Sequence, residues 1–454
     1  MKVDLCVIGA GAGGLSVAAG AVQMGARVAL IEAGRMGGDC LNTGCVPSKA
    51  LLAAAKSRPE AGYAAAMAQA AAAIARIAPH DSEERFAGLG VDVIRGWARF
   101  VGPATVEVAG RRITARRFVL ATGARPAVPP LPGLDQVPYL TPETLFDLRE
   151  PPGRLLILGG GPVGVELAQA HCRLGVPVTV VEAGRMLARE DPMLAEEVLD
   201  RLVAEGVTLI AGTPVAAVEG APGAMTLRLA DGRHVSGTHL LLATGRRPAL
   251  EGLGLDAAGI AVEEGRVKVD ARLRTTNRRV FAIGDAASAL QFTHVAGYQA
   301  GVVVRQAVLG LPARARSDHI PRVLYTEPEL AQIGLTEPEA RARYGARLTV
   351  IDRPLSGVDR AVTDGIEGGR IRLMVVRGRP VGVGLTGPAA GEMIGIWALI
   401  FARRLGVSAL AATVLPYPVL SELSKQAAGA YFSPQLFDNP LLKRVVRLVQ
   451  RYLP

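Results

Sequence analysis

The sequence contains little cysteine, few aromatic residues and no long uninterrupted apolar run. Four cysteines in 454 residues are too few for the disulfide framework of a secreted scaffold. Aromatic residues make up 4% of the chain, and the positive charges behind its net charge of +10 are scattered. A nucleic-acid-binding surface needs such charges clustered, so we expect no nucleic-acid partner. No apolar stretch of about 18 residues lacks charges or breaks, and we expect no membrane span.

The start of the chain also argues against export. Residues 1–4 run directly into an apolar strand pattern and leave no room for a signal peptide, so we expect a cytoplasmic protein. Half of the residues are hydrophobic, which is enough for two or three domains with cores of their own. Cys6, in that first strand, and Cys172, in a helical segment, are interpreted as small core residues.

The most informative pattern is an internal repeat of strand, glycine loop, helix and a second strand that ends in an acid. The first copy consists of the strand Val3–Ile8, a loop with Gly9, Gly11 and Gly14, a helix to about Met24, and the strand Val28–Ile31 followed by Glu32. The second copy consists of the strand Leu155–Leu158, a loop with Gly159, Gly161 and Gly164, a helix to about Leu174, and the strand Val178–Val181 followed by Glu182. Each copy matches the dinucleotide-binding pattern, in which glycines let the pyrophosphate approach, the helix N-terminus attracts its charge and the acid binds ribose hydroxyls.

Three further strand ends extend these two predicted sites. The residues at these ends are Ala121, Thr122 and Gly123 after the first strand, Gly245 after the second, and Gly284 and Asp285 after the third. A carboxylate at the C-terminal edge of a strand, such as Asp285, is well placed to bind a cofactor hydroxyl. From about Ile320 the pattern changes to alternating strands and two helical runs, which is typical of an α+β domain.

Cys40 and Cys45 lie shortly after the first glycine loop. Two thiols beside a bound redox cofactor indicate a dithiol that exchanges electrons rather than a structural clip. A five-residue step rises about 7.5 Å in a regular helix, which exceeds the upper end of the Cα spacing in disulfides, about 6.8 Å. A bridge therefore needs a distorted turn, and Gly44, together with Gly37 and Gly38, supplies the backbone freedom.

Taken together, these segments resemble the class I pyridine nucleotide-disulfide oxidoreductases, which include dihydrolipoamide dehydrogenase, glutathione reductase and mercuric reductase. The resemblance covers the whole chain, and the segments that carry it are Gly9–Gly14, Gly38–Lys49, Gly159–Glu166, Ala243–Gly245, Ile283–Asp285 and Tyr325–Glu329. It implies that the first glycine loop binds FAD and the second a nicotinamide nucleotide. It also implies a homodimer whose C-terminal domain completes the active site across the interface.

The resemblance further implies roles for individual residues. Cys45 would be the thiolate that faces the flavin, and Cys40 the outer thiol that exchanges with the substrate. Lys49 would pair with Glu166 near the flavin and the reacting nicotinamide, and Asp285 would bind the ribityl chain of FAD. These roles agree with the tendency of a helix N-terminus to stabilise a thiolate and with the need of a buried lysine for a carboxylate. For Glu166 the alternative is a polar residue of the first helical turns.

Glu182 favours NADH as the electron donor. A carboxylate at this position accepts hydrogen bonds from an unmodified 2′-hydroxyl and repels a 2′-phosphate. The nearby Arg185 and Arg189 keep NADPH as the less favoured alternative.

One segment departs from the family pattern. Dithiol-handling members carry a His-Pro segment near the C-terminus, whose histidine acts as acid–base toward the outer thiol and is oriented by a glutamate. Here Tyr417 occupies the place of the histidine while Glu422 remains, and no histidine follows His319. A phenol with a pKa of about 10 is a poor proton acceptor at neutral pH, whereas imidazole, at about 6.5, is well matched. We therefore predict inefficient turnover of dihydrolipoamide or glutathione. The alternative is that Tyr417 only packs at the interface.

Mercuric reductases resemble this chain in having tyrosine at that place, but they also use a C-terminal cysteine pair. No cysteine follows Cys172 here, so soft-metal capture would depend on Cys40 and Cys45 alone. No dedicated metal site is predicted.

The last predicted helix, Leu441–Leu453, is amphipathic and basic. Its cations Lys443, Arg447 and Arg451 recur every four residues, opposite Leu441, Val445, Leu448 and Tyr452. We favour a helix docked on its own dimer. The alternative is a helix that rests on an anionic membrane surface, as in quinone-reducing NADH dehydrogenases.

The sequence therefore predicts an α/β protein with two Rossmann-like dinucleotide-binding domains and a C-terminal α+β dimerisation domain. The expected segments are residues 1–148 and 248–318 for the FAD-binding domain, 149–247 for the NAD(P)-binding domain and 319–454 for the dimerisation domain. The predicted function is transfer of electrons from NAD(P)H through FAD to the cysteine pair and on to a small disulfide or soft electrophile, as in dihydrolipoamide dehydrogenase or mercuric reductase. The alternatives are an NADH:quinone reductase at a membrane surface and a non-catalytic flavin-bearing partner subunit.

Overall fold

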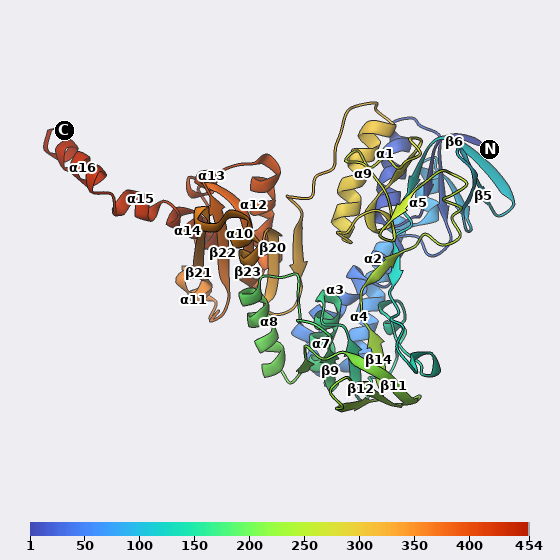
Figure 1. Cartoon of the computed structure of the whole chain (residues 1–454), viewed down its shortest axis with the longest axis horizontal. Coiled ribbons are helices and arrows are strands. Elements are labelled where there is room, and N and C mark those ends of the chain that lie inside the picture. The colour runs from blue at the N-terminus through green and yellow to red at the C-terminus, as the bar shows by residue number, and fades with distance from the viewer. Residues whose placement is uncertain (453–454) are drawn as a thin grey trace. The chain divides into compact units, whose positions relative to one another are not determined.

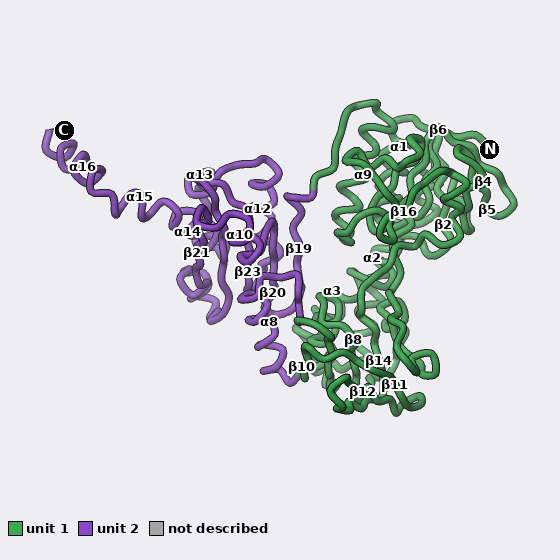
Figure 2. The backbone as a smooth tube through the Cα atoms, viewed as in Figure 1, with its two compact units in different colours: residues 1–185, 207–316 green, residues 186–206, 317–454 purple. Residues whose placement is uncertain are grey.

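The chain divides into two compact units in a computed structural model that describes residues 1–452 (Figure 2). Unit 1 contains residues 1–185 and 207–316, and unit 2 contains residues 186–206 and 317–454. Unit 1 thus holds both predicted dinucleotide-binding repeats. The sequence-based division assigned residues 186–206 to the NAD(P)-binding domain, whereas here they belong to unit 2. The expected domain boundaries stay a prediction.

The first repeat forms a sheet whose central strands run in parallel (Figure 1). Its strands are β1 (Lys2–Ile8), β2 (Val28–Glu32), β3 (Asp92–Arg95), β4 (Arg99–Gly102), β5 (Thr105–Val108), β6 (Arg111–Leu120) and β18 (Val280–Ala282). Their order is β3-β2-β1-β6-β5-β4, and β18 pairs with the end of β6. Ile8 lies level with Ile31 on one side and Leu120 on the other, so the strands end together at one edge. The predicted strands of the first repeat are confirmed.

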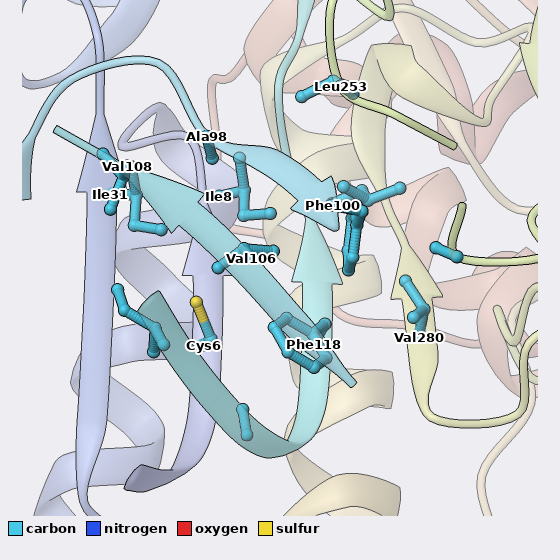
Figure 3. Close-up of a cluster of buried hydrophobic side chains, with 14 of the residues drawn as sticks. Cys6, Ile8, Ile31, Ala98, Phe100, Val106, Val108, Phe118, Leu253 and Val280 are labelled. Carbon is cyan, nitrogen blue, oxygen red and sulfur yellow. The ribbon is translucent and has the colours of Figure 1, made fainter. Parts of the chain in front are cut away.

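Helices α1 (Ala12–Gln23), α5 (Glu83–Gly88) and α9 (Thr293–Ala307) cover one face of this sheet, and a second apolar core fills the other face. The cysteine segment forms α2 (Gly38–Asn42) and α3 (Cys45–Ser57), and α3 packs against α4 (Gly62–Ile77) and a helix of the second repeat. Figure 3 shows Cys6 among the side chains of this second core, with Ile8, Phe118 and Val280 close by. Cys6 has no exposed surface, and its burial raises the thiol pKa to about 12. Its prediction as an inert core residue is confirmed.

The second repeat forms a smaller parallel sheet in the order β10-β9-β8-β14. Its elements are β8 (Leu155–Leu158), α7 (Pro162–Arg173), β9 (Val178–Val181), β10 (Thr208–Ile210) and β14 (His239–Leu242), with an antiparallel meander of β11 (Val215–Ala221), β12 (Ala224–Leu229) and β13 (His234–Gly237). The two repeats are joined by a short antiparallel pair, β7 (Ala124–Pro126) and β15 (Arg246–Pro248). Cys172, on α7, is only partly buried, so its prediction as a core residue was wrong in that respect.

Unit 2 is built on a five-stranded antiparallel sheet, which confirms the predicted α+β character. The strands are, in spatial order, β19 (Pro321–Leu324), β20 (Glu329–Gly334), β23 (Arg379–Gly387), β22 (Arg370–Val376) and β21 (Thr349–Pro354). The helices are α8 (Pro192–Ala204), α10 (Glu337–Tyr344), α11 (Asp359–Thr363), α12 (Ala390–Arg403), α13 (Val407–Ala411), α14 (Glu422–Ala430), α15 (Ser433–Phe437) and α16 (Pro440–Tyr452). Trp397 of α12 is fully buried in the core and donates to the Ser424 hydroxyl at 3.0 Å.

A buried ion network ties the segment 186–206 to this sheet. Arg372 on β22 lies 3.0 Å from Asp191, which precedes α8, and also pairs with Glu337 at the start of α10. Asp191 is 1% exposed and also accepts from the backbone N–H groups of Met193 and Glu337. A buried charge is tolerated when it is paired and hydrogen-bonded in this way. These contacts explain why α8 belongs to unit 2 although it follows the second repeat in the sequence.

The last helix begins within one residue of its predicted start. The expected segment Leu441–Leu453 is found as α16, and Leu453 lies outside the described residues. Within residues 1–452, no helix combines the length and the apolar character needed to cross a bilayer.

Candidate functional site

The cysteine pair lies at a break between two helices of unit 1. α2 ends at Asn42, Gly44 precedes the next helix, and Cys45 is the first residue of α3. A Cβ at Gly44 would lie 2.9 Å from the carbonyl oxygen of Asp39, so only glycine fits this tight turn. The distorted turn that the spacing of the cysteines predicts is therefore present, and it places Cys45 at a helix N-terminus.

The two thiols have opposite acidities. A hydrogen bond from Cys40 lowers the pKa of Cys45 to about 5, helped by the Thr293 hydroxyl, 3.5 Å from its sulfur, and by the charge of Lys49. The same contact, together with burial, raises the pKa of Cys40. At neutral pH the reduced pair therefore holds a thiolate at Cys45 and a protonated thiol at Cys40.

We expect alkylation of Cys45 in the reduced protein to be half-maximal near pH 5 and constant above about pH 7. The thiolate is the nucleophile, so the rate falls only when acid protonates Cys45, well below the pKa of about 8.5 for a free cysteine. Peptide mass spectrometry after timed treatment with iodoacetamide measures this profile for each thiol. In Thr293→Val, which loses the hydroxyl contact, the midpoint should move to higher pH. A common midpoint near pH 8.5 for Cys40 and Cys45 would contradict the assignment.

An ion pair joins the cysteine helix to the second repeat. Lys49, one turn after Cys45 on α3, places its ammonium nitrogen 2.7 Å from the carboxylate of Glu166 on α7. Glu166 is 5% exposed and Lys49 is 35% exposed, so the pair lies at the edge of the interior. The expected Lys49–Glu166 contact is present; the charge of Lys49 lowers the pKa of Cys45, and the charge of Glu166 partly offsets that effect.

Four of the loop glycines are required by packing within the protein. A Cβ at Gly14 would lie 1.8 Å from the carbonyl oxygen of Gly9, and one at Gly164 would lie 2.0 Å from that of Gly159. Gly9 and Gly159 themselves have positive φ angles, 104° and 116°. Each pair therefore lets its helix start directly against its strand, as the close helix–strand packing of a dinucleotide loop requires.

The middle glycine of each loop has no such protein neighbour. A Cβ at Gly161 would meet nothing within 4 Å, and one at Gly11 would meet only the Cα of Gly38 at 3.8 Å. Both residues precede a helix, α7 and α1, whose first N–H groups point into this space. The open cradle at a helix N-terminus fits a pyrophosphate.

The acid of each repeat is held beside its own glycine loop. Glu32 accepts from the N–H groups of Ala10 and Gly34, both at 2.6 Å. Glu182 accepts from Gly160 at 2.7 Å and from Gly184 at 2.9 Å. Each carboxylate oxygen has a second lone pair, which leaves both acids able to accept from the hydroxyls of a ribose.

An open pocket of about 1320 Å³, including the solvent at its mouth, contains the cysteine pair, Gly11 of the first glycine loop and the start of α7. The predicted site residues that line it are Gly11, Cys40, Cys45, Lys49, Ala121, Gly123, Glu166, Gly245, Gly284 and Asp285. Beside it, the hydroxyl of Thr122 is buried and has no hydrogen-bond partner among the described residues. Burial raises the pKa of Asp285, an effect that Arg246 partly offsets. The cradle, the orphaned hydroxyl and the carboxylates together fit a large polar cofactor such as FAD.

Arg246 and Asp39 are site residues that the sequence did not identify as such. Arg246 pairs with Asp39, lies 3.5 Å from Asp285 and donates to the Ala124 carbonyl at 2.7 Å. The sequence feature that could have identified them is their position: Arg246 directly follows Gly245, and Asp39 directly precedes Cys40. The arginine thus connects the cysteine segment to the predicted cofactor carboxylate.

Tyr417 and Glu422 belong to unit 2 and are described there alone. Tyr417 is 70% exposed, and its hydroxyl donates to Asp359 at 2.7 Å. Asp359 raises the pKa of this phenol, and the charge of Glu422, the first residue of α14, adds to that effect. The sequence suggested Glu422 as the neighbour of Tyr417, whereas the hydrogen bond goes to Asp359. In the part of the chain described, no cluster of three or more histidine, cysteine or acidic residues is suited to hold a metal ion.

Comparison with known proteins is consistent along the chain. A family model described as pyridine nucleotide-disulphide oxidoreductase matches residues 3–300, and a model of the dimerisation domain of the same proteins matches residues 320–428. A mercuric reductase from Bacillus cereus is 35% identical over 447 residues, which are 93% of this chain and 70% of that protein. A dihydrolipoyl dehydrogenase from Thermus scotoductus is 36% identical over 465 residues, 94% of this chain and 97% of that protein.

A solved structure with the same fold is the Cu(II) complex of the HOCl-induced flavoprotein disulfide reductase RclA from Escherichia coli. It superposes with a TM-score of 0.88 at 30% identity and covers 95% of this chain and 99% of that chain.

Proposed function

Because the chain belongs to the pyridine nucleotide-disulphide oxidoreductase family, whose members are enzymes that bind FAD and a pyridine nucleotide, we propose that it passes electrons from NADH through FAD to Cys40 and Cys45 and on to a soft electrophile or small disulfide. The match to the dimerisation domain supports a homodimer. The single observation that carries this proposal is the acidic Cys45 thiol beside Cys40, in one pocket with Gly11 of the first glycine loop and with Val163 and Glu166 of the helix that follows the second loop.

The residues of this chain bind and orient the cofactors and manage the protons. The first glycine loop and Glu32 bind FAD, and the second loop and Glu182 bind the nicotinamide nucleotide. Bound FAD supplies the exchange between two-electron hydride chemistry and thiol chemistry. In the net reaction NADH and the Cys40–Cys45 disulfide become NAD⁺, the Cys45 thiolate and the Cys40 thiol, so the hydride supplies both electrons and the one proton that Cys40 keeps. The Lys49–Glu166 pair would hold charge near bound FAD, and Cys45 keeps its sulfur as thiolate while Cys40 keeps the proton.

NADH is the proposed electron donor because of Glu182. Its carboxylate accepts hydrogen bonds from Gly160 and Gly184 beside the second glycine loop. In that position it would accept from a ribose 2′-hydroxyl and repel a 2′-phosphate.

Glu182→Gln is expected to shift the ratio of kcat/KM for NADPH over NADH upward by roughly ten-fold or more, because repulsion of a phosphate is removed and a charge-assisted hydrogen bond is weakened. Steady-state kinetics with both nucleotides and a fixed acceptor measure the ratio. The matched variant Glu32→Gln changes the corresponding acid of the first loop and should leave the ratio as it is. An unchanged ratio in Glu182→Gln would show that this carboxylate does not select the nucleotide.

A soft electrophile is favoured over a disulfide acceptor because of Tyr417. Exchange with a disulfide needs a base that takes the proton from the Cys40 thiol and returns it to the leaving sulfur, and a phenol whose pKa is raised by Asp359 stays protonated at neutral pH. A soft metal ion or an electrophilic acceptor takes electrons from the thiols without that step. Rates with Hg²⁺, lipoamide and a quinone, measured on the same holoenzyme, test the order. Lipoamide as the fastest acceptor would overturn it.

Tyr417→His is expected to raise lipoamide reduction by roughly 10²-fold, because an imidazole with a pKa near neutrality replaces a poor base. Tyr417→Phe serves as the control, since it keeps the ring and removes only the hydroxyl that donates to Asp359. The side chain is largely exposed, so both variants are expected to fold. If Tyr417→His gives no gain, the position serves packing and not proton transfer.

A further inference from the structure

The C-terminal helix α16 has an apolar face that no part of unit 2 covers. Figure 1 shows α15 and α16 extending from α14 away from the five-stranded sheet of this unit. None of the residues of α16 is buried, and Leu441, Leu448 and Tyr452 are 67%, 57% and 69% exposed. On the chain that the structure describes, this is a large apolar surface in contact with water.

The residues of α16 divide into two separate faces. With about 100° between successive residues, the apolar face covers an arc of about 160°. Its members are Leu441, Leu442, Val445, Val446, Leu448, Val449 and Tyr452. The remaining arc holds Lys443, Arg444, Arg447, Gln450 and Arg451. Residues 439–454 include no acid, so the polar face carries positive charge only.

The sequence before the helix fixes its start. The side chain of Asn439 accepts from the N–H groups of Leu441 and Leu442, at 3.0 and 3.2 Å, and Pro440 occupies the first helical position. An isolated helix of 13 residues is nevertheless marginal in water. The apolar face must therefore be covered for α16 to persist.

Leu436 and Phe437 of α15 enlarge the apolar surface. They line a shallow groove together with Leu442 and Val446, with Lys443 and Arg447 at its edge. Phe437 is 67% exposed. The apolar surface thus continues from α16 onto α15, bordered by cations.

We propose that α15 and α16 bind the surface of an anionic phospholipid bilayer, with the apolar face among the acyl chains and the cations among the headgroups. Charge complementarity selects this occupant. A helix docked on protein gains from opposite charges three or four residues apart on its wet face, whereas here cations recur at that spacing with no acid between them. Arg444 lies at one border of the apolar face, and Lys443, beside Gln450, is the cation nearest to the other border, where phosphate groups would meet them. The helix is too short and too charged to cross the bilayer.

Flotation of the full-length holoenzyme with vesicles tests the proposal. We expect it to float with vesicles of equal parts phosphatidylglycerol and phosphatidylcholine, to stay behind with phosphatidylcholine alone, and to be released in about 1 M salt, where the Debye length is about 3 Å. Arg444→Glu/Arg447→Glu should bind the anionic vesicles roughly thirty-fold more weakly. Leu448→Glu should weaken binding as well, because it places a charge in the apolar face.

The matched control is Arg343→Glu/Arg347→Glu, which makes the same charge change at exposed positions elsewhere on unit 2. It should bind like the unchanged protein, because its cations lie outside α15 and α16. If both double variants lose vesicle binding equally, binding is due to the general basicity of the protein. If the unchanged protein binds neutral and anionic vesicles equally, the cations of α16 do not contribute to binding. Each result overturns the proposal. An absence of vesicle binding also overturns the proposal. If, in addition, the Leu448→Glu protein dissociates to monomers in sedimentation velocity, a second copy of the chain covers the apolar face instead. Ferricyanide reduction by NADH reports separately whether each variant retains a working cofactor site.

Discussion

Cys45→Ser reduces NADH-driven turnover of any thiol-dependent acceptor by at least about 10³-fold. The serine hydroxyl cannot form the disulfide with Cys40, and its oxygen is neither a thiolate nor a soft nucleophile. The position also carries the negative charge that Cys40, Thr293 and Lys49 stabilise, and a serine hydroxyl stays neutral there. Steady-state rates with Hg²⁺ and lipoamide, compared with the unchanged protein, measure the loss.

The same variant supplies its own control for folding. Ferricyanide takes electrons from reduced flavin without a thiol, so NADH:ferricyanide activity should stay within the same order of magnitude. Cys6→Ser is the matched cysteine control, because Cys6 is buried in the core and outside the pocket. The folded fraction of the Cys6→Ser protein should reduce the acceptor at the rate of the unchanged protein. Turnover in Cys45→Ser equal to that of the unchanged protein would make the cysteines bystanders.

Arg372→Leu destabilises unit 2 by about 3–5 kcal/mol, because it leaves Asp191 buried and without its partner cation. Asp191 is 1% exposed and cannot gain water in place of the guanidinium. A loss of this size lowers the melting temperature of a unit of this length by roughly 10 °C or more. Differential scanning calorimetry of the holoenzyme resolves the transition, and it should be the transition of unit 2 that moves.

Arg341→Leu is the matched comparison, since Arg341 also donates to Glu337, at 2.6 Å, but from an exposed position. An exposed ion pair contributes at most about 1 kcal/mol, so this variant should melt within a few degrees of the unchanged protein. Equal shifts in the two variants would mean that burial of Asp191 does not determine the stability of the network.

The local elements around the candidate site were predicted well. Glycine loops, the strands before them and the acids after them follow short patterns, because turn sterics and helix N-termini act within a few residues. The break at Gly44 was predicted from the spacing of two cysteines, and it lies between two helices as the geometry demands. The amphipathic period likewise gave the start of α16 to within about one residue.

The contacts that the sequence did not reveal join residues far apart in the chain. Arg246 meets Asp39 across 207 positions, and Arg372 meets Asp191 across 181. No local periodicity marks such pairs, because an arginine on a solvated surface and an arginine in a buried ion pair look the same in the sequence. The Tyr417–Asp359 bond was missed for the same reason, since the nearer Glu422 was the only acid that the segment itself offered.

The measurement that tests the central claim most directly is an anaerobic titration of the oxidised holoenzyme with NADH. The claim is that Cys40 and Cys45 store two electrons next to a flavin that stores two more. The unchanged protein should therefore take up two equivalents of NADH per flavin, and the first should produce the long-wavelength absorbance of a thiolate–flavin charge-transfer contact. Cys45→Ser should take up one equivalent and show no such band. Uptake of a single equivalent by the unchanged protein, with bleaching of the flavin and no band, would contradict the account.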